Sequence, residues 1–441
     1  MSQPVETTVN CTSTRPALWN EFLKAIRHEV IPALGCTEPV SLALASAIAT
    51  RHLGSMPDKI EALVSPNLMK NGMDVTVPGT GMVGLPIAAA MGALIGDPDG
   101  ELEVLRRITP ESVITGKQML ADGRVTIGIT DVPNILYAEV RLTKGPDKVR
   151  VCIADSHTQV VRIEKNGDVL FATESQANSH SPSYNLHGSS LHDVFTFAMS
   201  APFADIAFIL EAEKLNWRLS QEGLSGNYGL HIGATLQRNI ERGWLSGDLQ
   251  TRISMLSAAA SDARMGGATL PAMSNSGSGN QGIAATLPVV VVAQAVNADE
   301  EKRARALMLS HLVAVYIHDK LPRLSALCAV TTAAMGSAAG MAWLLGGNFE
   351  TISRAICSMI GDLAGMICDG ASNSCAMKVS TSANSAYKAV LMALDNSRVS
   401  GMEGIVADSV EDSISNLCSL ASEGMVHTDH QIIRIMIGKA S

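Results

Sequence analysis

The chain has 441 residues, of which 46% are hydrophobic and only 4% aromatic, with 37 glycines and a formal net charge of −9. This length exceeds one ordinary core, so we expect two domains. Many small residues and few aromatics favour close-packed helices over a β-sandwich. The negative charge excludes the basic surface that binds nucleic acid or an anionic membrane, so the expected partner is a small molecule.

The first residues, MSQPVETTVN, lack a basic start followed by an apolar run. No secretory signal is therefore predicted, and the expected location is the cytoplasm. The eight cysteines at irregular spacing are then expected to be free thiols, metal ligands or catalytic thiols rather than disulfides.

The first part of the chain predicts a mixture of helices and strands. Residues 17–53 indicate two helices that are interrupted at IPALGC, where Pro32 and Gly35 break the pattern. A strand candidate follows at MDVTVPG. Between residues 125 and 174, short β-rich runs separated by turns predict an antiparallel sheet, and Asn166-Gly167 is typical of a tight hairpin. Residues 1–195 are thus predicted to form an α+β domain.

Residues 196–441 show helical periodicity and are predicted to form a large all-helical domain. One run, from Leu324 to Phe349, has no charged residue and is long enough to cross a bilayer. Its Ala, Gly, Ser and Thr residues gain little from lipid, so we interpret it as a buried helix and expect no membrane partner.

Two segments, GTGMVG at 79–84 and GSGNQG at 277–282, match the dinucleotide-binding fingerprint. The first lacks the second strand and the acidic residue that a nucleotide fold requires, and the second lacks a convincing strand before it. We therefore interpret both as backbone in close approach, with exposed N–H groups able to hold a small carboxylate.

Three cysteines of the helical part, Cys328, Cys368 and Cys375, form a candidate metal site. A loop between the last two can fold back so that both sulfurs face one point, and the first can complete a tripod. Three thiolates suit a 4Fe-4S cluster with one open iron. Zinc, or a role as small buried hydrophobes, stays open from the spacing alone.

Four segments together, EVIPALGCTEP, SPNLMKNGMDVTVPGTG, SNSGSGNQGIAATLPV and GMICDGASNSCAMKV, resemble the L-cysteine desulfidase family of UPF0597 type. That family is related through its helical half to the iron–sulfur L-serine dehydratases. The resemblance covers nearly the whole chain and implies a 4Fe-4S cluster on Cys328, Cys368 and Cys375. The Ser-Ser-His-Thr motif of the serine dehydratases is not found here, and its absence favours the desulfidase branch.

The resemblance implies conversion of L-cysteine to pyruvate, ammonia and sulfide without pyridoxal phosphate, with Cys36 of GCTEP as the base. Cys36 precedes a predicted helix, whose unpaired N–H groups are expected to lower the pKa of a nearby thiol. Polar residues in the same segments are candidates for binding the substrate: Asn67, Lys70, Asn71, Ser276, Ser278 and Asn280.

The histidines are weaker candidates. His157, His311, His318, His427 and His430 are all expected to be satisfied or surface imidazoles.

Two other functions remain open from the sequence. One is an iron–sulfur L-serine or L-threonine dehydratase, in which hydroxide leaves instead of sulfide. The other is a binding protein for a small amino acid, with structural or zinc-bound cysteines. We expect a homodimer because the helical half is apolar.

Overall fold

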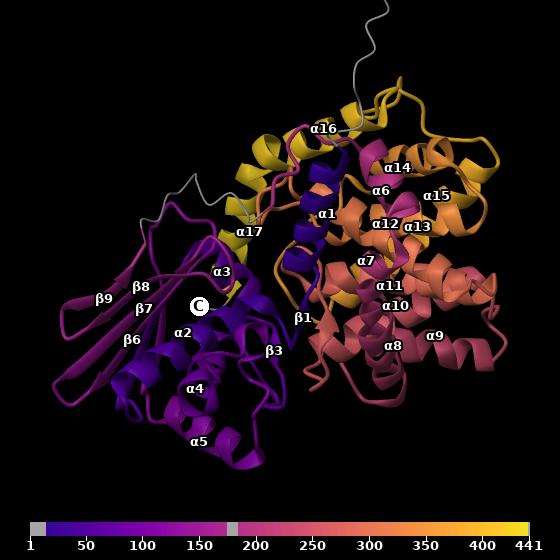
Figure 1. The fold of residues 1–441 in the computed structure, drawn as a ribbon. Helices are drawn as coiled ribbons and strands as arrows, with labels where there is room; N and C mark the ends of the chain where they lie inside the picture. Colours follow the sequence, from indigo (N-terminus) through magenta and orange to yellow (C-terminus); the bar gives the residue numbers. More distant parts are fainter. Residues whose placement is uncertain (1–14, 174–183, 440–441) are drawn as a thin grey trace, which may run out of the picture.

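The computed structural model describes residues 15–173 and 184–439. Figure 1 shows an α/β part beside a larger helical part. The predicted α+β class, with an antiparallel sheet followed by a large helical region, is confirmed. The expectation about a secretory signal concerns residues 1–10, which lie outside the described residues.

The α/β part contains one main sheet and the helices that cover it. Its strand order is β5-β2-β6-β7-β8-β9, and all neighbouring strands are antiparallel except β2 and β5. The helices are α2 (Thr37–Leu53), α3 (Pro66–Gly72), α4 (Leu85–Ile95) and α5 (Pro110–Ala121), with a 3₁₀ turn at Glu101–Glu103. The strands are β2 (Lys59–Val64), β3 (Thr76–Val77), β4 (Met82–Val83), β5 (Val125–Ile129), β6 (Tyr137–Lys144), β7 (Asp147–Ala154), β8 (Val160–Lys165) and β9 (Asp168–Ala172).

The strands largely follow the sequence pattern. Asn166 and Gly167 join β8 to β9 with positive φ angles of 54° and 96°, as a tight hairpin turn requires. Strand β2 was not predicted, although its residues alternate between buried and more exposed positions. The candidate at MDVTVPG is only the two-residue strand β3, paired with β4.

Helix α2 is the central helix of the α/β part. It packs on β6 and β7 and also on α4, so nearly all of its residues are buried. Small residues allow this close approach: a Cβ added at Gly92 of α4 would lie 2.2 Å from the carbonyl oxygen of Ala43 in α2. The position of α2 fixes the place of Cys36, which immediately precedes it.

The helical part is formed mainly by residues after 190. Its helices are α1 (Arg15–Glu29), α6 (Leu191–Ser200), α7 (Phe203–Ile206), α8 (Leu210–Ser225), α9 (Ile232–Glu241), α10 (Leu249–Met265), α11 (Gly279–Ala295), α12 (Glu300–His318), α13 (Val330–Leu344), α14 (Phe349–Leu363), α15 (Cys375–Leu394), α16 (Val410–Ser419) and α17 (Val426–Lys439). A 3₁₀ turn at Ala207–Ile209 and a π turn at Leu420–Gly424 complete it.

The uncharged run contains α13, which is buried along almost its whole length. Gly336 permits close contact with α12, since a Cβ there would lie 2.1 Å from the carbonyl oxygen of Ser310. In the described part of the chain, no single helix is long and apolar enough to cross a membrane; α6 and the segment Phe203–Ser225, bent by 117°, meet those criteria only as a pair. The homodimer and the cytoplasmic location stay predictions.

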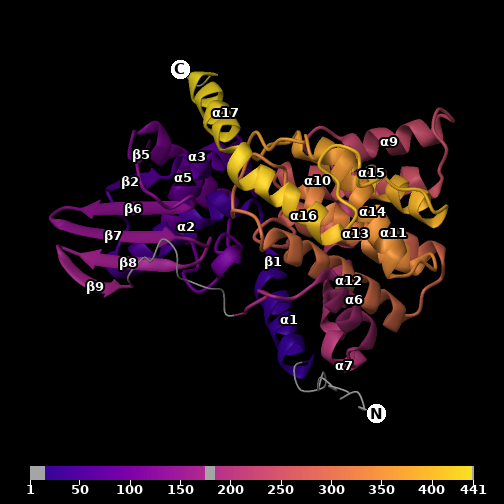
Figure 2. The same cartoon turned by 90° about the horizontal axis from the view of Figure 1, so that it is seen from above.

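The two ends of the chain connect the two parts. Helix α1 precedes the α/β part, yet its residues Phe22 and Ile26 belong to the helical core. Directly after α1 in the sequence, the short strand β1 (Pro32–Ala33) pairs antiparallel with β10 (Ala272–Met273) of the helical part. Helix α17 returns from the helical part to α3, as Figure 2 shows. The predicted boundary at 195/196 falls inside α6 and stays a prediction.

We expect Gly92→Ala to lower the free energy of unfolding by about 1–3 kcal/mol, because the new methyl group overlaps the backbone of α2. This loss should exceed the gain of about 1 kcal/mol in helix propensity. Urea unfolding measures the effect. Gly247→Ala is the control, since its Cβ would make only an ordinary contact with Ile240 at 3.5 Å. Equal stability of the two variants would contradict this account of the α2–α4 contact.

Candidate active site

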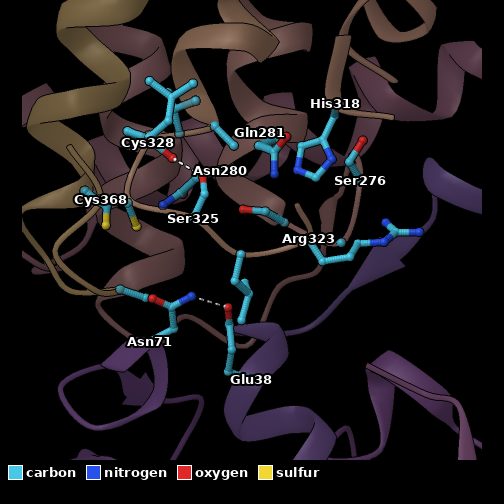
Figure 3. A pocket seen from close by; sticks show the side chains of 18 of the residues that line it. Glu38, Asn71, Ser276, Asn280, Gln281, His318, Arg323, Ser325, Cys328 and Cys368 are labelled. Atoms are coloured by element: carbon cyan, nitrogen blue, oxygen red, sulfur yellow. Dashed lines mark hydrogen bonds between the residues drawn. The ribbon is translucent and has the colours of Figure 1, made fainter. Parts of the chain in front are cut away.

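A pocket lies between the two parts, and Figure 3 shows residues from both around it. The α/β part contributes Cys36, Glu38, Asn71 and His157. The helical part contributes Arg264, Ser276, Gly277, Ser278, Asn280, Gln281, His318, Arg323, Cys328, Cys368 and Cys375, among others. All predicted site residues except Asn67 and Lys70 therefore line this pocket.

The three candidate ligand cysteines are brought together by the backbone. The segments before α13 and before α15 pair through an antiparallel bridge between Leu327 and Ile367. Within it, the amide of Cys328 donates to the carbonyl of Met366 at 2.9 Å, and the amide of Cys368 donates to the carbonyl of Ala326 at 2.7 Å. Cys375 is the first residue of α15 and lines the same pocket as Cys328 and Cys368.

The turn that returns the chain from Cys368 to Cys375 requires glycine. Gly370 has a φ of +99°, and a Cβ there would lie 2.5 Å from the carbonyl oxygen of Lys70. The predicted fold-back of this loop therefore has a direct steric basis.

The thiols lie in an environment suited to binding a cation. Burial raises the pKa of Cys328, and the nearby Cys368 and Cys375 raise it further. Burial also raises the pKa of Cys375. Such thiols are costly to ionise alone, and a bound metal removes that cost.

The three cysteines can be compared with the ligand sets of the two metal groups that the sequence left open, a zinc ion and an iron–sulfur cluster. Within residues 15–173 and 184–439, no three Cys, His, Asp or Glu side chains are placed to hold a single metal ion. Three cysteines line the pocket, one fewer than the four ligands of a structural zinc site, and three sulfur donors fit an iron–sulfur cluster with three protein ligands.

Asn67 and Lys70 lie elsewhere than expected. Lys70 is fully buried and donates to Asp429 of α17 at 2.5 Å, with a longer contact of 3.5 Å to the carbonyl of Cys368. The amide of Asn67 also donates to Asp429. These residues do not line the pocket; they connect α3 to α17 and support the cysteine loop from behind.

Cys36 is a buried thiol at the N-cap of α2. Its Sγ donates a hydrogen bond to Oε2 of Glu38 at 3.0 Å. Burial raises the pKa of Cys36 well above its ordinary value, and the charge of Glu38 raises it further, against an opposing effect of Arg264. The expectation that the helix N-terminus lowers this pKa is therefore wrong, because desolvation and the carboxylate outweigh the helix dipole.

Glu38 accepts the hydrogen bond of Cys36 and is a pocket residue that the sequence analysis did not single out. Its carboxylate accepts hydrogen bonds from Cys36 and from Thr37 at 3.1 Å. It also accepts one from Asn71 at 3.0 Å, which Figure 3 shows. Burial raises its pKa, but the charge of His157 and the bonds from Cys36 and Asn71 outweigh burial, so the pKa is lowered. Burial lowers the pKa of His157 itself, so near neutral pH the hydrogen bonds keep Glu38 ionised.

The glycine loop at 277–282 is close-approach backbone, as predicted. A Cβ at Gly282 would lie 1.9 Å from the carbonyl oxygen of Met273. The predicted side chains are partly engaged inside the protein: Ser276 donates to Asn275 at 2.8 Å, and Asn280 contacts Ser261 at 3.0 Å and Met265.

The hydroxyl of Ser278 makes no hydrogen bond to another described residue. It is therefore free to bind a ligand in the pocket.

Comparison with known proteins identifies the family. The model of the serine dehydratase alpha chain family matches residues 100–434. A UPF0597 protein of Chromobacterium violaceum is 65% identical, over 96% of this chain and 98% of the relative. A UPF0597 protein of Yersinia enterocolitica is 61% identical, over 97% and 98%. The UPF0597 protein YhaM of Shigella sonnei is 59% identical, over 97% and 99%.

The chain belongs to the UPF0597 proteins of the serine dehydratase alpha chain family. The predicted family relationship is thus confirmed. The names of the UPF0597 relatives state no reaction.

One segment of this chain is similar to the Ser-Ser-His-Thr motif of the serine dehydratases. The segment Asp155-Ser156-His157-Thr158 differs from Ser-Ser-His-Thr only at its first position, and its His157 lines the pocket. The full Ser-Ser-His-Thr motif is absent, as the sequence analysis states, but three of its four residues occur together at 156–158.

The histidines divide into two groups. His311 is buried between Asn275 at 3.1 Å and Thr286 at 3.0 Å, and burial lowers its pKa to about 3, so it is a satisfied core residue as expected. His157 and His318 line the pocket, which differs from the expectation. Burial lowers the pKa of both, to about 4 for His318, so this family member presents two neutral imidazoles to a ligand.

A partly buried ion pair places Arg323 at the wall of the pocket. Arg323 binds Glu29 of α1 with two hydrogen bonds, of 2.6 and 2.9 Å, and Tyr184 donates to the same carboxylate at 2.8 Å. Burial raises the pKa of Glu29, but Arg323 and Tyr184 outweigh it and lower the pKa to about 2. The pair fixes α1 to the segment after α12.

The folded-state pKa of Glu29 is lowered, so its ionised form stabilises the fold above the unfolded pKa of about 4.3, and this stabilisation is lost as pH falls toward 2. We expect Glu29→Gln to lower the free energy of unfolding by about 3 kcal/mol at neutral pH. The difference from the unsubstituted protein should narrow as the pH approaches 2. Urea unfolding across this range measures it, and a constant difference would contradict the assignment.

Proposed function

We propose that this protein is an iron–sulfur-dependent L-cysteine desulfidase, a carbon–sulfur lyase that converts L-cysteine and water to pyruvate, ammonia and hydrogen sulfide. The observation that carries the proposal is one pocket that combines the thiols of Cys328, Cys368 and Cys375 with the hydrogen-bonded pair of Cys36 and Glu38. Membership of the serine dehydratase alpha chain family supports a lyase with an iron–sulfur cofactor. The 4Fe-4S form and the cysteine substrate go beyond that support.

Cys328, Cys368 and Cys375 are the residues that would hold the cluster. When bound, the cluster supplies Lewis-acid chemistry at the sulfur that leaves the substrate. The chain itself must bind the amino acid, exclude water and move the α-proton.

Cys36 and Glu38 are the candidates for moving that proton. The thiol donates to the carboxylate in the resting state. As the sulfur of Cys36 accepts the α-proton, its own proton passes to Glu38, so the thiol is unchanged and the carboxylate becomes a carboxylic acid. This relay needs no free thiolate, which the raised pKa of Cys36 disfavours.

Elimination then breaks the bond from the β-carbon to sulfur and forms aminoacrylate. The aminoacrylate takes up a proton at the β-carbon to become an imine, and water converts the imine to pyruvate and ammonia. Glu38 in its acid form can return the proton through Cys36. The free hydroxyl of Ser278 and the neutral imidazoles of His157 and His318 are available to hold the substrate.

An L-serine or L-threonine dehydratase is the second candidate, with hydroxide as the leaving group. The name of the family and the segment Asp155–Thr158 favour it. The proton relay and the ligand cysteines would have the same roles in both reactions.

An anaerobic preparation separates these enzymes from a binding protein. We expect a brown protein that contains iron and acid-labile sulfide and that releases sulfide and pyruvate from L-cysteine. A colourless, inactive protein with stoichiometric zinc would favour a binding protein with structural cysteines instead.

Serine substitutions test the ligand set. Cys328→Ser, Cys368→Ser and Cys375→Ser should each lose iron and activity together, because each removes one of three sulfur donors. Cys418→Ser is the control, since Cys418 is buried in α16 outside the pocket. Iron analysis and sulfide release are the measurements. A full iron complement in all three variants would show that the ligand assignment is wrong.

Substitutions of the relay should separate proton transfer from cluster binding. Cys36→Ala and Glu38→Gln should keep their iron but lose on the order of 10² to 10⁴ in kcat, the usual contribution of one positioned base. Exchange of the substrate α-hydrogen with solvent should fall in parallel, because the relay carries that proton.

Cys36→Ser is a stricter test, since its hydroxyl can still donate to Glu38 but is a much poorer proton carrier. Normal α-hydrogen exchange in Cys36→Ser would refute the base assignment. Loss of iron in Cys36→Ala would make this thiol a ligand.

A further inference from the structure

Arg264, near the end of α10, is a buried cation with little around it to balance its charge. The residue is 3% exposed and lines the pocket. Its side chain makes one hydrogen-bond contact to the described residues, from Nη1 to the sulfur of Met265 at 3.2 Å, and its Nε has no partner. Within residues 15–173 and 184–439, no carboxylate lies within 4 Å of its guanidinium.

The other charged groups of the lining are better satisfied. Arg323 is neutralised by its two bonds to Glu29. Glu38 accepts three hydrogen bonds. A buried guanidinium without an anion is costly, and an anionic ligand that binds beside it removes that cost. Arg264 is therefore the charged residue of the lining that lacks its counter-charge.

The guanidinium of Arg264 also packs against the start of a long helix. Helix α11 begins at Gly279, and a Cβ added there would lie 2.2 Å from Nε of Arg264. Only a glycine leaves room for the side chain in this position. The first turn of α11 has backbone N–H groups without helical partners and carries the positive end of the helix dipole. Two sources of positive potential thus meet at one point of the pocket.

We infer that Arg264 and the first turn of α11 bind the carboxylate of the substrate, so that the pocket selects amino acids with a free α-carboxylate. The inference rests on the proposed function and names the recognition site for its substrate class. The planar guanidinium can form two parallel hydrogen bonds to a carboxylate, and the N–H groups of α11 and the hydroxyl of Ser278 add further donors.

Acceptors for the amino group are present on the same lining. Oδ1 of Asn71 and Oε1 of Gln281 are buried and have no hydrogen-bond partner among the residues that the structure describes. An ammonium group has only donors, so it complements these oxygens. The lining therefore offers cationic donors for one end of an amino acid and neutral acceptors for the other.

A different role for Arg264 must be separated from this one. The guanidinium lowers the pKa of Cys36 and of Cys375 against the larger effect of burial, so it also interacts with the thiols. If its purpose were to balance the charge of the ligand cysteines, its removal would release iron rather than impair recognition of a carboxylate.

The test uses two thiol ligands and the anaerobic, iron-loaded protein. 3-Mercaptopropionate carries a thiol and a carboxylate, whereas cysteamine carries a thiol and an ammonium group. Calorimetry measures the binding of each to the unsubstituted protein, to Arg264→Gln and to Arg264→Lys. Arg252→Gln, on the same helix but outside the pocket, is the matched control.

We expect Arg264→Gln to bind 3-mercaptopropionate about 10- to 100-fold more weakly, the usual effect of losing a hydrogen bond to a charged group. Cysteamine binding and iron content should not change. Arg264→Lys keeps the charge but loses the planar fork, so its loss should be smaller, and it serves as the test if the Gln variant does not fold. Arg252→Gln should bind both ligands normally.

Three results would overturn the inference: unchanged binding of 3-mercaptopropionate, equal weakening of both ligands, or loss of iron. These failures are distinct from failure of the proposed function. If the unsubstituted protein releases sulfide but Arg264→Gln binds 3-mercaptopropionate normally, the function stands and this site is wrong. If binding is lost selectively but L-cysteine yields no sulfide, the site stands and the function is wrong.

Discussion

Burial of ionisable side chains between the α/β part and the helical part is the constraint on which the site depends. A charge without water must be neutralised or paired. Glu29 is paired with Arg323, and Lys70 with Asp429, while burial keeps His157 and His318 neutral. Within the described residues, what remains is the guanidinium of Arg264 without an anion, together with the thiols of Cys328 and Cys375, whose pKa values burial raises. The pocket is thus prepared for an anion and for a metal-containing group.

The path of the chain explains why these ionisable side chains lie between the two parts. Helix α1 packs on the helical core before the chain enters the α/β part, and α17 returns to α3 at the end. The ion pairs of Glu29 and Asp429 therefore lie close to the crossings of the chain. Because Lys70 also reaches the backbone of Cys368, the contact between α3 and α17 is coupled to the position of the cysteine loop. Neither part contains a complete site alone.

Much of the fold could be predicted because it depends on local patterns. Pro32 and Gly35 interrupt the first helices, and the turn at Asn166 and Gly167 follows from backbone preferences that need no tertiary information. Strand β2 was missed because it lies between helices, without a hairpin partner next to it in the sequence. The gathering of the three cysteines was expected mainly from the family resemblance, since their spacing alone left zinc and simple burial open.

The site was harder to predict where the role of a residue depends on the direction of its side chain and on its burial. Lys70 and Asn67 have suitable chemistry, but their side chains contact α17 instead of the pocket. The pKa of Cys36 depends on its burial and on the direction in which Glu38 points, and neither can be read from a helix N-terminus. Arg264 resembles an ordinary basic residue in the last turn of a helix. It is distinguished by the lack of a counter-charge among the described residues of the folded protein.

The choice of leaving group is the central claim, because the fold and the family accommodate sulfide and hydroxide alike. One anaerobic, iron-loaded preparation assayed with L-cysteine and with L-serine tests it most directly, with pyruvate as the common product and sulfide as the specific one. The account predicts a higher kcat/KM for L-cysteine, with sulfide and pyruvate formed in equal amounts. Rapid formation of pyruvate from L-serine, together with no sulfide from L-cysteine, would contradict it.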